Sequence, residues 1–169
     1  KRGLLAAFYL ELTTGLRRGE LLALQWDDLN LETGELQVTK QVYRTKEDGL
    51  LISQPKTKSS IRTVSLPPPL LNILKEYREG VNSRWMFPSP VKEDSPLDPA
   101  YIRTRLHFIL EHAQCKQIRF HDLRHTFATI ALGNGMDVKT LSAMLGHVSA
   151  ATTLDIYTHI TNPMRSEAA

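Results

Sequence analysis

A chain of 169 residues with a formal net charge of +3 and a sequence pI of about 9.1 has the size of one globular domain. Its 41% of hydrophobic and 23% of charged residues include no apolar run long enough to span a bilayer, and the start does not resemble a signal peptide. The single cysteine, Cys115, excludes an internal disulfide and a cysteine-based metal site, and it fits a reducing cytoplasm. The mild basicity alone agrees with a polyanionic partner and with an ordinary solvated surface.

The first segment is predicted to be a helix over residues 1–14, because apolar residues recur there at helical spacing. Gly15 ends it, since glycine permits a tight backbone path. We expect Arg17 to leave the turn before a second helix. Glu20 is expected to form a surface pair with a nearby arginine, which contributes little to stability.

The middle of the chain predicts a small antiparallel sheet of about three strands. Alternating apolar residues favour strands within 26–39, at 50–52 and at 63–66. The polar segment 40–49 is expected to be a mobile connection. Residues 54–62 are basic and rich in hydroxyl groups, which is typical of a hairpin tip.

Helices dominate the rest of the chain. We predict helices over 70–80, from Pro99 to His112 with Asp98 as N-cap, and from Phe120 to Gly133. Asp137 is expected to cap a further helix, and a last one runs over 150–159. The prolines within 87–96 exclude a regular helix there. The fold class is therefore α+β and mainly α-helical, in a single domain over residues 1–169.

The helix that opens at Phe120 is the most informative element. On a helical wheel, Leu123, Phe127 and Ile130 form the face expected in the core. The other face is expected to present His121, Arg124, His125 and Ala128. A lone His-x-x-Arg pattern is more simply interpreted as a solvated face, so the remaining motifs decide its meaning.

Four short motifs occur in a fixed order along the chain. They are TGLRRGEL at 14–21, PKTK at 55–58, HDLRHT at 121–126, and LGH at 145–147 followed by TTLDIYTH at 152–159. In these motifs and this spacing, the chain resembles the catalytic domain of the tyrosine recombinases, the phage-integrase family. The hairpin motif is similar to that of integrases from temperate phages and conjugative transposons. The resemblance covers about residues 4–160.

The resemblance implies a DNA strand transferase. Arg17 and Arg124 correspond to guanidiniums that bind the scissile phosphate, to which each can donate two parallel hydrogen bonds. His147 corresponds to a further donor to a non-bridging oxygen, and Tyr157 to the nucleophile. His121 is implied as proton acceptor or orienting group.

The resemblance also implies a general acid on the hairpin. Lys56 is the expected donor to the departing 5′ oxygen, and Lys58 is the alternative. The product would be a 3′-phosphotyrosyl intermediate and a free 5′ hydroxyl. Because the enzyme–DNA bond conserves the bond energy, neither a metal ion, nor ATP, nor another cofactor is implied.

The implied partner is double-stranded DNA. Candidate DNA contacts outside the catalytic set are Lys58, Arg62, Arg119 and His125. Further basic residues that could bind DNA phosphates are Lys40, Arg44, Lys46, Arg103, Arg105, Lys116 and Lys139. The family's core-binding and arm-binding domains are expected to lie outside this chain. The full protein is expected to act as a tetramer on two DNA sites, and this fragment is expected to be a monomer. The expected location is the bacterial cytoplasm.

Three rival functions fit parts of the chain. A recombinase-derived DNA-binding module without activity should have lost a catalytic residue type, and none is lost. A type IB topoisomerase uses similar chemistry, but the spacing from His147 to Tyr157 matches the recombinases better. A regulator with a helix-turn-helix around Gly133 to Gly146 leaves Arg17 and Tyr157 without a role.

Overall fold

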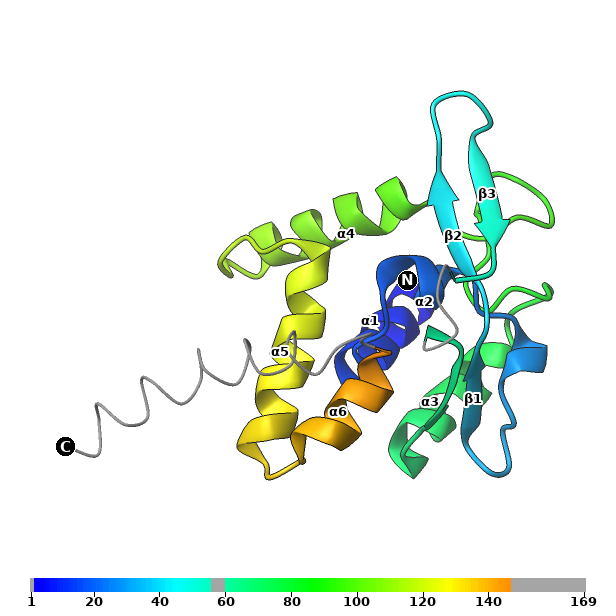
Figure 1. The fold of residues 1–169 in the computed structure, drawn as a ribbon. Coiled ribbons are helices and arrows are strands. Elements are labelled where there is room, and N and C mark those ends of the chain that lie inside the picture. Colours follow the sequence, from blue (N-terminus) through cyan, green and yellow to red (C-terminus); the bar gives the residue numbers. More distant parts are fainter. Residues whose placement is uncertain (1, 56–59, 147–169) are drawn as a thin grey trace.

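Six α-helices, one 3-10 turn and two antiparallel strand pairs make up the part of the chain described by the structure, a computed structural model covering residues 2–55 and 60–146 (Figure 1). In chain order they are α1 Arg2–Thr14, α2 Arg18–Leu22, η1 Trp26–Asp28, β1 Glu35–Val38, β2 Gln41–Arg44, β3 Leu50–Ser53, β4 Arg62–Ser65, α3 Pro68–Arg78, α4 Pro99–His112, α5 Phe120–Gly133 and α6 Val138–Leu145. The mainly α-helical α+β prediction is confirmed.

Helix α1 lies at the centre of the molecule and packs against α2, α3 and α5. Ala6, Ala7 and Leu10 are essentially inaccessible to solvent, which places this face in the core. The helix ends at Thr14, because Gly15 takes the left-handed conformation with φ +60° and its N–H bonds to the Glu11 carbonyl oxygen at 2.8 Å. The turn lies against Phe127 of α5 and Leu145 of α6.

The turn at Gly15 tolerates no side chain. A Cβ there would lie 2.4 Å from Cδ1 of Phe127 and 2.9 Å from Cδ2 of Leu145, and the positive φ adds strain. We expect Gly15→Ala to lower the free energy of unfolding by about 3 kcal/mol, combining overpacking with left-handed strain. Urea denaturation measures the loss.

Gly49→Ala is the matched control for that prediction. Gly49 also has a positive φ, +76°, but a Cβ there meets no atom within 4 Å. Gly49→Ala should lower the free energy of unfolding by about 1 kcal/mol, from backbone strain alone. If both variants lose the same free energy of unfolding, the close contact of the added Cβ with Phe127 and Leu145 contributes nothing to the loss at Gly15.

The strands form two antiparallel pairs, where about three strands were expected. Strand β1 pairs with β4, with Leu36 opposite Val64, and β2 pairs with β3, with Val42 opposite Ile52. The β2–β3 hairpin projects from the body in Figure 1. Strand β2 lies in the segment 40–49 that was expected to be a mobile connection.

Two local features explain the differences in the strand region. Val42 is 3% exposed and its carbonyl oxygen lies against α2, where a Cβ on Gly19 would come within 2.6 Å of it. Burial of one face therefore makes β2 regular. The strand expected to begin at Trp26 is a 3-10 turn followed by a single bridge from Leu29 to Leu36.

Helices α4 to α6 begin and end as the sequence predicts. The carboxylates of Asp98 and Asp137 accept hydrogen bonds from the amides of Ala100 and Thr140, so both aspartates cap their helices. Helix α6 ends at Gly146 with φ +63°. The last expected helix, at 150–159, lies outside the described residues.

The buried face of α5 differs from the expected one. Leu123 and Phe127 are buried as predicted, but Ile130 is 57% exposed while Arg124 is only 3% exposed. Ala128 is also buried. The face that was expected to meet solvent through Arg124 is thus turned into the molecule, with only its two histidines outside.

Within the described residues, no helix is long and apolar enough to cross a membrane.

Candidate active site

Three arginine side chains converge on the carboxyl end of α6. Arg62 donates through Nε to the Met144 carbonyl oxygen, Arg124 through Nη2 to that of Leu145 at 2.7 Å, and Arg17 through Nη2 to that of Gly146 at 3.0 Å. A helix leaves its last carbonyl groups without partners and carries a partial negative charge there. Guanidiniums from three distant segments satisfy these groups together.

Glu20 holds two of these arginines. Its Oε1 accepts from Nη1 of Arg17 at 2.7 Å, and its Oε2 accepts from Nη2 of Arg62 at 2.9 Å. Burial alone would raise the pKa of Glu20, but the hydrogen bonds and charges of Arg62 and Arg17 together hold it below its usual value. The expectation of a surface pair at Glu20 is wrong, because this side chain is only 1% exposed and stays ionised.

Arg124 is the most deeply placed of the three. Its Nη1 donates to the Gly15 carbonyl oxygen at 2.6 Å, so the guanidinium bridges the end of α1 and the end of α6. Burial and then the charge of Arg17 lower the pKa of Arg124 to about 10. The side chain is therefore still a cation at neutral pH.

A second buried carboxyl group lies nearby on α1. Glu11 is 0% exposed, and neither of its oxygens has a hydrogen-bond partner among the described residues. Burial raises the pKa of Glu11 well above its usual value, against the attraction of Arg124. The raised pKa favours the protonated form of Glu11, whereas the carboxylate of Glu20 is held ionised by its bonds to Arg17 and Arg62.

Glu11→Gln is expected to reduce the decline in the free energy of unfolding as pH rises above the usual pKa of a glutamate. Because the pKa of Glu11 is higher in the folded than in the unfolded state, its stabilising effect is complete below the unfolded pKa and is lost as pH rises through the folded one. Glutamine has no proton to release. The difference between variant and parent should grow with pH by at most about 1.4 kcal/mol per unit.

Urea unfolding from acidic to alkaline pH measures this difference. Glu47→Gln, at an exposed position between β2 and β3, is the control and should follow the parent. Parallel profiles for Glu11→Gln and the parent would contradict a buried neutral acid.

The two histidines of α5 lie beside this cluster. Their rings meet edge to face, with centroids of His121 and His125 4.7 Å apart. Burial and then the charges of His125 and Arg124 lower the pKa of His121. Its imidazole is therefore neutral at neutral pH and has a free lone pair with which to accept a proton.

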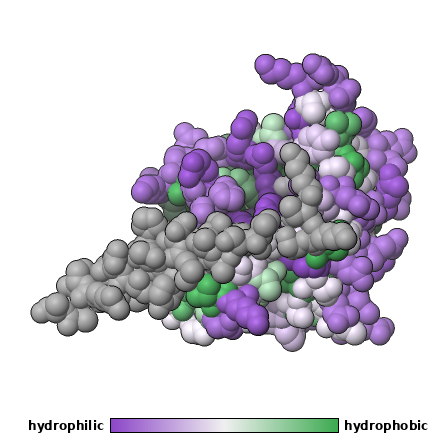
Figure 2. Space-filling view, viewed as in Figure 1, coloured by the Kyte–Doolittle hydropathy of each residue, from purple (hydrophilic) through white to green (hydrophobic). Residues whose placement is uncertain are grey.

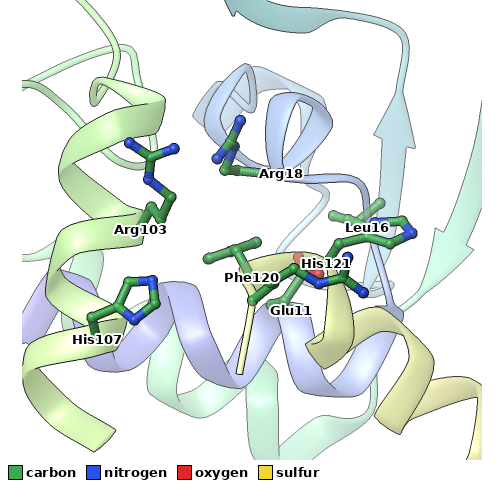
Figure 3. Close-up of a pocket in the computed structure, with 8 residues that line it drawn as sticks. Glu11, Leu16, Arg18, Arg103, His107, Phe120 and His121 are labelled. Carbon is green, nitrogen blue, oxygen red and sulfur yellow. The ribbon is translucent and has the colours of Figure 1, made fainter. Parts of the chain in front are cut away.

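A cavity of about 330 Å³ opens next to His121 (Figure 3). Arg103 and His107 of α4 form one wall and Arg18 at the start of α2 forms another, with Phe120 below them. Among the described residues, no ion-pair partner is recorded for Arg18 or Arg103. Burial and then the charge of Arg103 lower the pKa of Arg18, so the two cations repel across the opening.

A second cavity, of about 380 Å³, continues from the first. It shares Arg18 and Arg103 and reaches the N-terminal end of α4 and strand β2. Arg44 on this side is bonded to Asp98. In Figure 2 the tip of the projecting hairpin is hydrophilic, and hydrophobic side chains lie below the tip. The two cavities therefore form a basic depression from β2 to the start of α5.

The structure brings together three of the predicted catalytic residues, Arg17, His121 and Arg124. The predicted residues Lys56, Lys58, His147 and Tyr157 lie outside the described residues. Gly146, the last described residue before His147, accepts a hydrogen bond from Arg17.

The predicted DNA contacts have different surroundings. Arg62, one of the predicted DNA contacts, has a side chain that is 7% exposed and bonded to Glu20. Arg119 is exposed and paired with Asp122 on its own helix. His125 is exposed. Within the ranges that the structure describes, no group of three or more histidines, cysteines or acidic residues could hold a metal ion.

Sequence reasoning missed two site residues, Glu20 and Arg18. The i, i+3 spacing of Arg17 and Glu20 with apolar Leu21 and Leu22 next to Glu20 was the available signal, since a charge inside an apolar segment requires a partner. Arg18 gave no signal, because its role depends on the approach of α4.

Comparison with known proteins gives a consistent result. The model of the phage integrase family matches residues 3–163. A tyrosine recombinase XerC-like protein of Caldanaerobacter subterraneus subsp. tengcongensis is 36% identical over 184 residues, which is 96% of this chain and 47% of that protein. The ICEBs1 integrase of Bacillus subtilis is 32% identical over 166 residues, or 92% of this chain and 45% of that protein.

The fold is also that of a solved structure. The Tn1549 transposon integrase, determined with a circular intermediate DNA, aligns with a TM-score of 0.80 and 22% identity, over 97% of this chain and 58% of the other. The chain thus spans about half the length of the curated relatives that it matches.

Proposed function

Because the chain belongs to the phage integrase family, we propose that residues 1–169 are the catalytic domain of an enzyme that cleaves and rejoins DNA at specific sites. The observation that carries this proposal is the charge of the arginine cluster. Three guanidiniums surround the ionised carboxylate of Glu20, and burial raises the pKa of the second carboxyl group, Glu11, which favours its neutral form. A buried site with uncompensated positive charge is built to accept an anion.

A phosphodiester group supplies that anion. Its charge grows on the non-bridging oxygens as a nucleophile attacks, and guanidiniums that are already oriented stabilise this charge without reorganising. Arg17 and Arg124 use only some of their N–H groups on backbone carbonyls and Glu20. Their remaining donors are the proposed ligands of the scissile phosphate, and His147 is the proposed third donor.

The proposed reaction is a transesterification. The Tyr157 phenolic oxygen attacks phosphorus, a new phosphotyrosyl bond forms to the 3′ phosphate, and the bond to the 5′ oxygen breaks. His121 accepts the phenolic proton, since its lowered pKa keeps the imidazole in the neutral form that has a lone pair to take it. Lys56, or alternatively Lys58, donates a proton to the 5′ oxygen. Attack by a 5′ hydroxyl reverses these steps, so no cofactor is consumed.

The basic depression is the proposed path of the DNA backbone. Arg18 and Arg103 face each other across its opening, and His107 and Arg119 line the same cavity. A phosphate next to the scissile one would relieve the repulsion between Arg18 and Arg103. Lys58 and His125 remain proposed contacts. Such contacts add affinity that weakens with salt and carry little sequence information.

The assembly is also a proposal. Integration or excision joins two DNA sites, so the full protein is proposed to act as a tetramer on two sites in a bacterial cytoplasm. For residues 1–169 alone we propose a monomer.

Covalent capture of DNA tests the proposed activity. The chain is incubated with negatively supercoiled plasmid, quenched with SDS, and analysed for relaxed plasmid and for DNA-linked protein, with and without EDTA. SDS-stable adducts that survive EDTA are expected. If adducts are absent both for this chain and for a longer chain that includes the upstream part of the gene product, the enzymatic proposal is wrong.

A further inference from the structure

Arg62 joins three separate segments of the chain. It is the first residue of β4, and its guanidinium is 7% exposed. It donates to the Met144 carbonyl oxygen at the end of α6, to both carboxylate oxygens of Glu20 on α2, and to the Ser60 carbonyl oxygen at 3.0 Å. No motif of the sequence assigns a role to this residue.

The geometry requires a guanidinium. Nη1 and Nη2 meet Oε1 and Oε2 of Glu20 at 3.2 and 2.9 Å, while Nε points to Met144. A planar fork can serve the carboxylate and the carbonyl at the same time. The ammonium group of lysine is a point charge on a flexible stem and cannot reproduce both edges.

Glu20, which Arg62 holds in place, in turn binds Arg17. The same carboxylate accepts from the Arg17 backbone N–H at 2.9 Å and from its Nη1 at 2.7 Å. Arg62 therefore sets the orientation of the group that orients Arg17. Since Arg17 also bonds to Gly146, the carboxyl end of α6 is held from two sides.

Arg62 packs closely against Gly146 at the carboxyl end of α6. A Cβ on Gly146 would lie 2.9 Å from Nη1 and 3.2 Å from Cζ of Arg62. Met144, Leu145 and Gly146 thus accept from Arg62, Arg124 and Arg17 in turn. A shift of Arg62 would loosen both the Glu20–Arg17 pair and the α6 end.

We propose that Arg62 is a positioning residue for the phosphate site. It holds Arg17, through Glu20, in a fixed relation to Arg124 and to the residue that precedes His147. This inference rests on the proposed function of Arg17 and Arg124 as phosphate ligands. Arg62 itself does not touch the DNA.

Arg62→Lys separates positioning from binding. With protein in excess over plasmid, the rate of covalent adduct formation is expected to fall about 10²-fold. This is the usual effect of displacing a reacting group by about 1 Å. The dissociation constant for the same DNA should change less than about twofold, since the charge remains and does not contact DNA. Arg84→Lys, at an exposed arginine paired with Asp94, is the matched control.

Hydrogen exchange supplies a second readout that does not depend on activity. Arg62→Lys should accelerate amide exchange in peptides covering both α6 and residues 17–22, at a temperature where thermal unfolding shows the variant folded. Arg62→Gln, which retains one donor group, replaces it if the lysine variant does not fold. Faster exchange in both segments supports the proposal.

The outcomes distinguish this inference from the proposed function. If the parent forms adducts and the variant forms them at the same rate, Arg62 is not a positioning residue. A weaker DNA affinity that accounts for the whole loss of rate also overturns the inference. If neither the parent nor the longer chain forms adducts, the proposed function fails, and unchanged exchange in the variant would then reject the role of Arg62 as well.

Discussion

Tyr157→Phe is expected to abolish DNA-linked protein and plasmid relaxation, with a loss of more than about 10⁴-fold, as when a covalent nucleophile is removed. Phenylalanine keeps the ring and lacks only the oxygen that forms the phosphotyrosyl bond. The side chain lies outside the described residues, so the expectation comes from its place ten residues after His147 in the sequence and from family membership.

Binding measurements make this result specific. The affinity of Tyr157→Phe for plasmid, and its decline with salt, should equal those of the parent, because phosphate contacts by basic side chains determine both. Tyr9→Phe, at an exposed tyrosine on α1, is the matched control and should retain adduct formation. Adducts in Tyr157→Phe at the rate of the parent would assign the nucleophile to another residue.

Helix ends and the fold class could be predicted because local signals determine them. Asp98, Asp137 and Gly15 act within a few residues of their own positions, and each ends or begins a helix as expected. The strand β2 could not be predicted in this way. Residues 41–44 are mostly polar, and they become regular because β3 pairs with them and Val42 packs against α2.

The candidate site was predictable as a set of residue types, but its contacts were not. The helical wheel placed Arg124 on the face of its helix opposite Leu123 and Phe127, away from the expected core. Its partners, the carbonyl oxygens of Gly15 and Leu145, lie 109 and 21 residues away in sequence. Helical periodicity contains no information about such partners, so the wheel could not show that a cation belongs to the inner face.

The contacts of Glu20 and Arg62 were also not predictable, because these two residues are distant in sequence. As a local pair, Arg17 and Glu20 would have little energetic weight. The contact with Arg62, 42 residues away, converts the pair into a buried network. Removing one member of such a network leaves uncompensated charge, which costs far more than a surface pair contributes.

Arg124→Met tests both the structural and the chemical part of this site. Methionine fills much of the space but leaves the Gly15 and Leu145 carbonyl oxygens without their donor, in a buried place. We expect the free energy of unfolding to fall by about 3–5 kcal/mol, as for other broken buried networks. Loss of a charged donor to the phosphate should also slow adduct formation about 10³-fold.

Arg124→Lys separates the two effects. Lysine restores the positive charge at the phosphate, but a single ammonium group cannot span the two carbonyl oxygens that Nη1 and Nη2 reach. Adduct formation should therefore recover in part while stability stays below that of the parent. Urea unfolding and single-turnover adduct assays measure the two quantities, with Arg84→Lys as the surface control. Full stability in both Arg124 variants would mean that the two carbonyl contacts contribute nothing. The guanidinium would then serve the DNA alone.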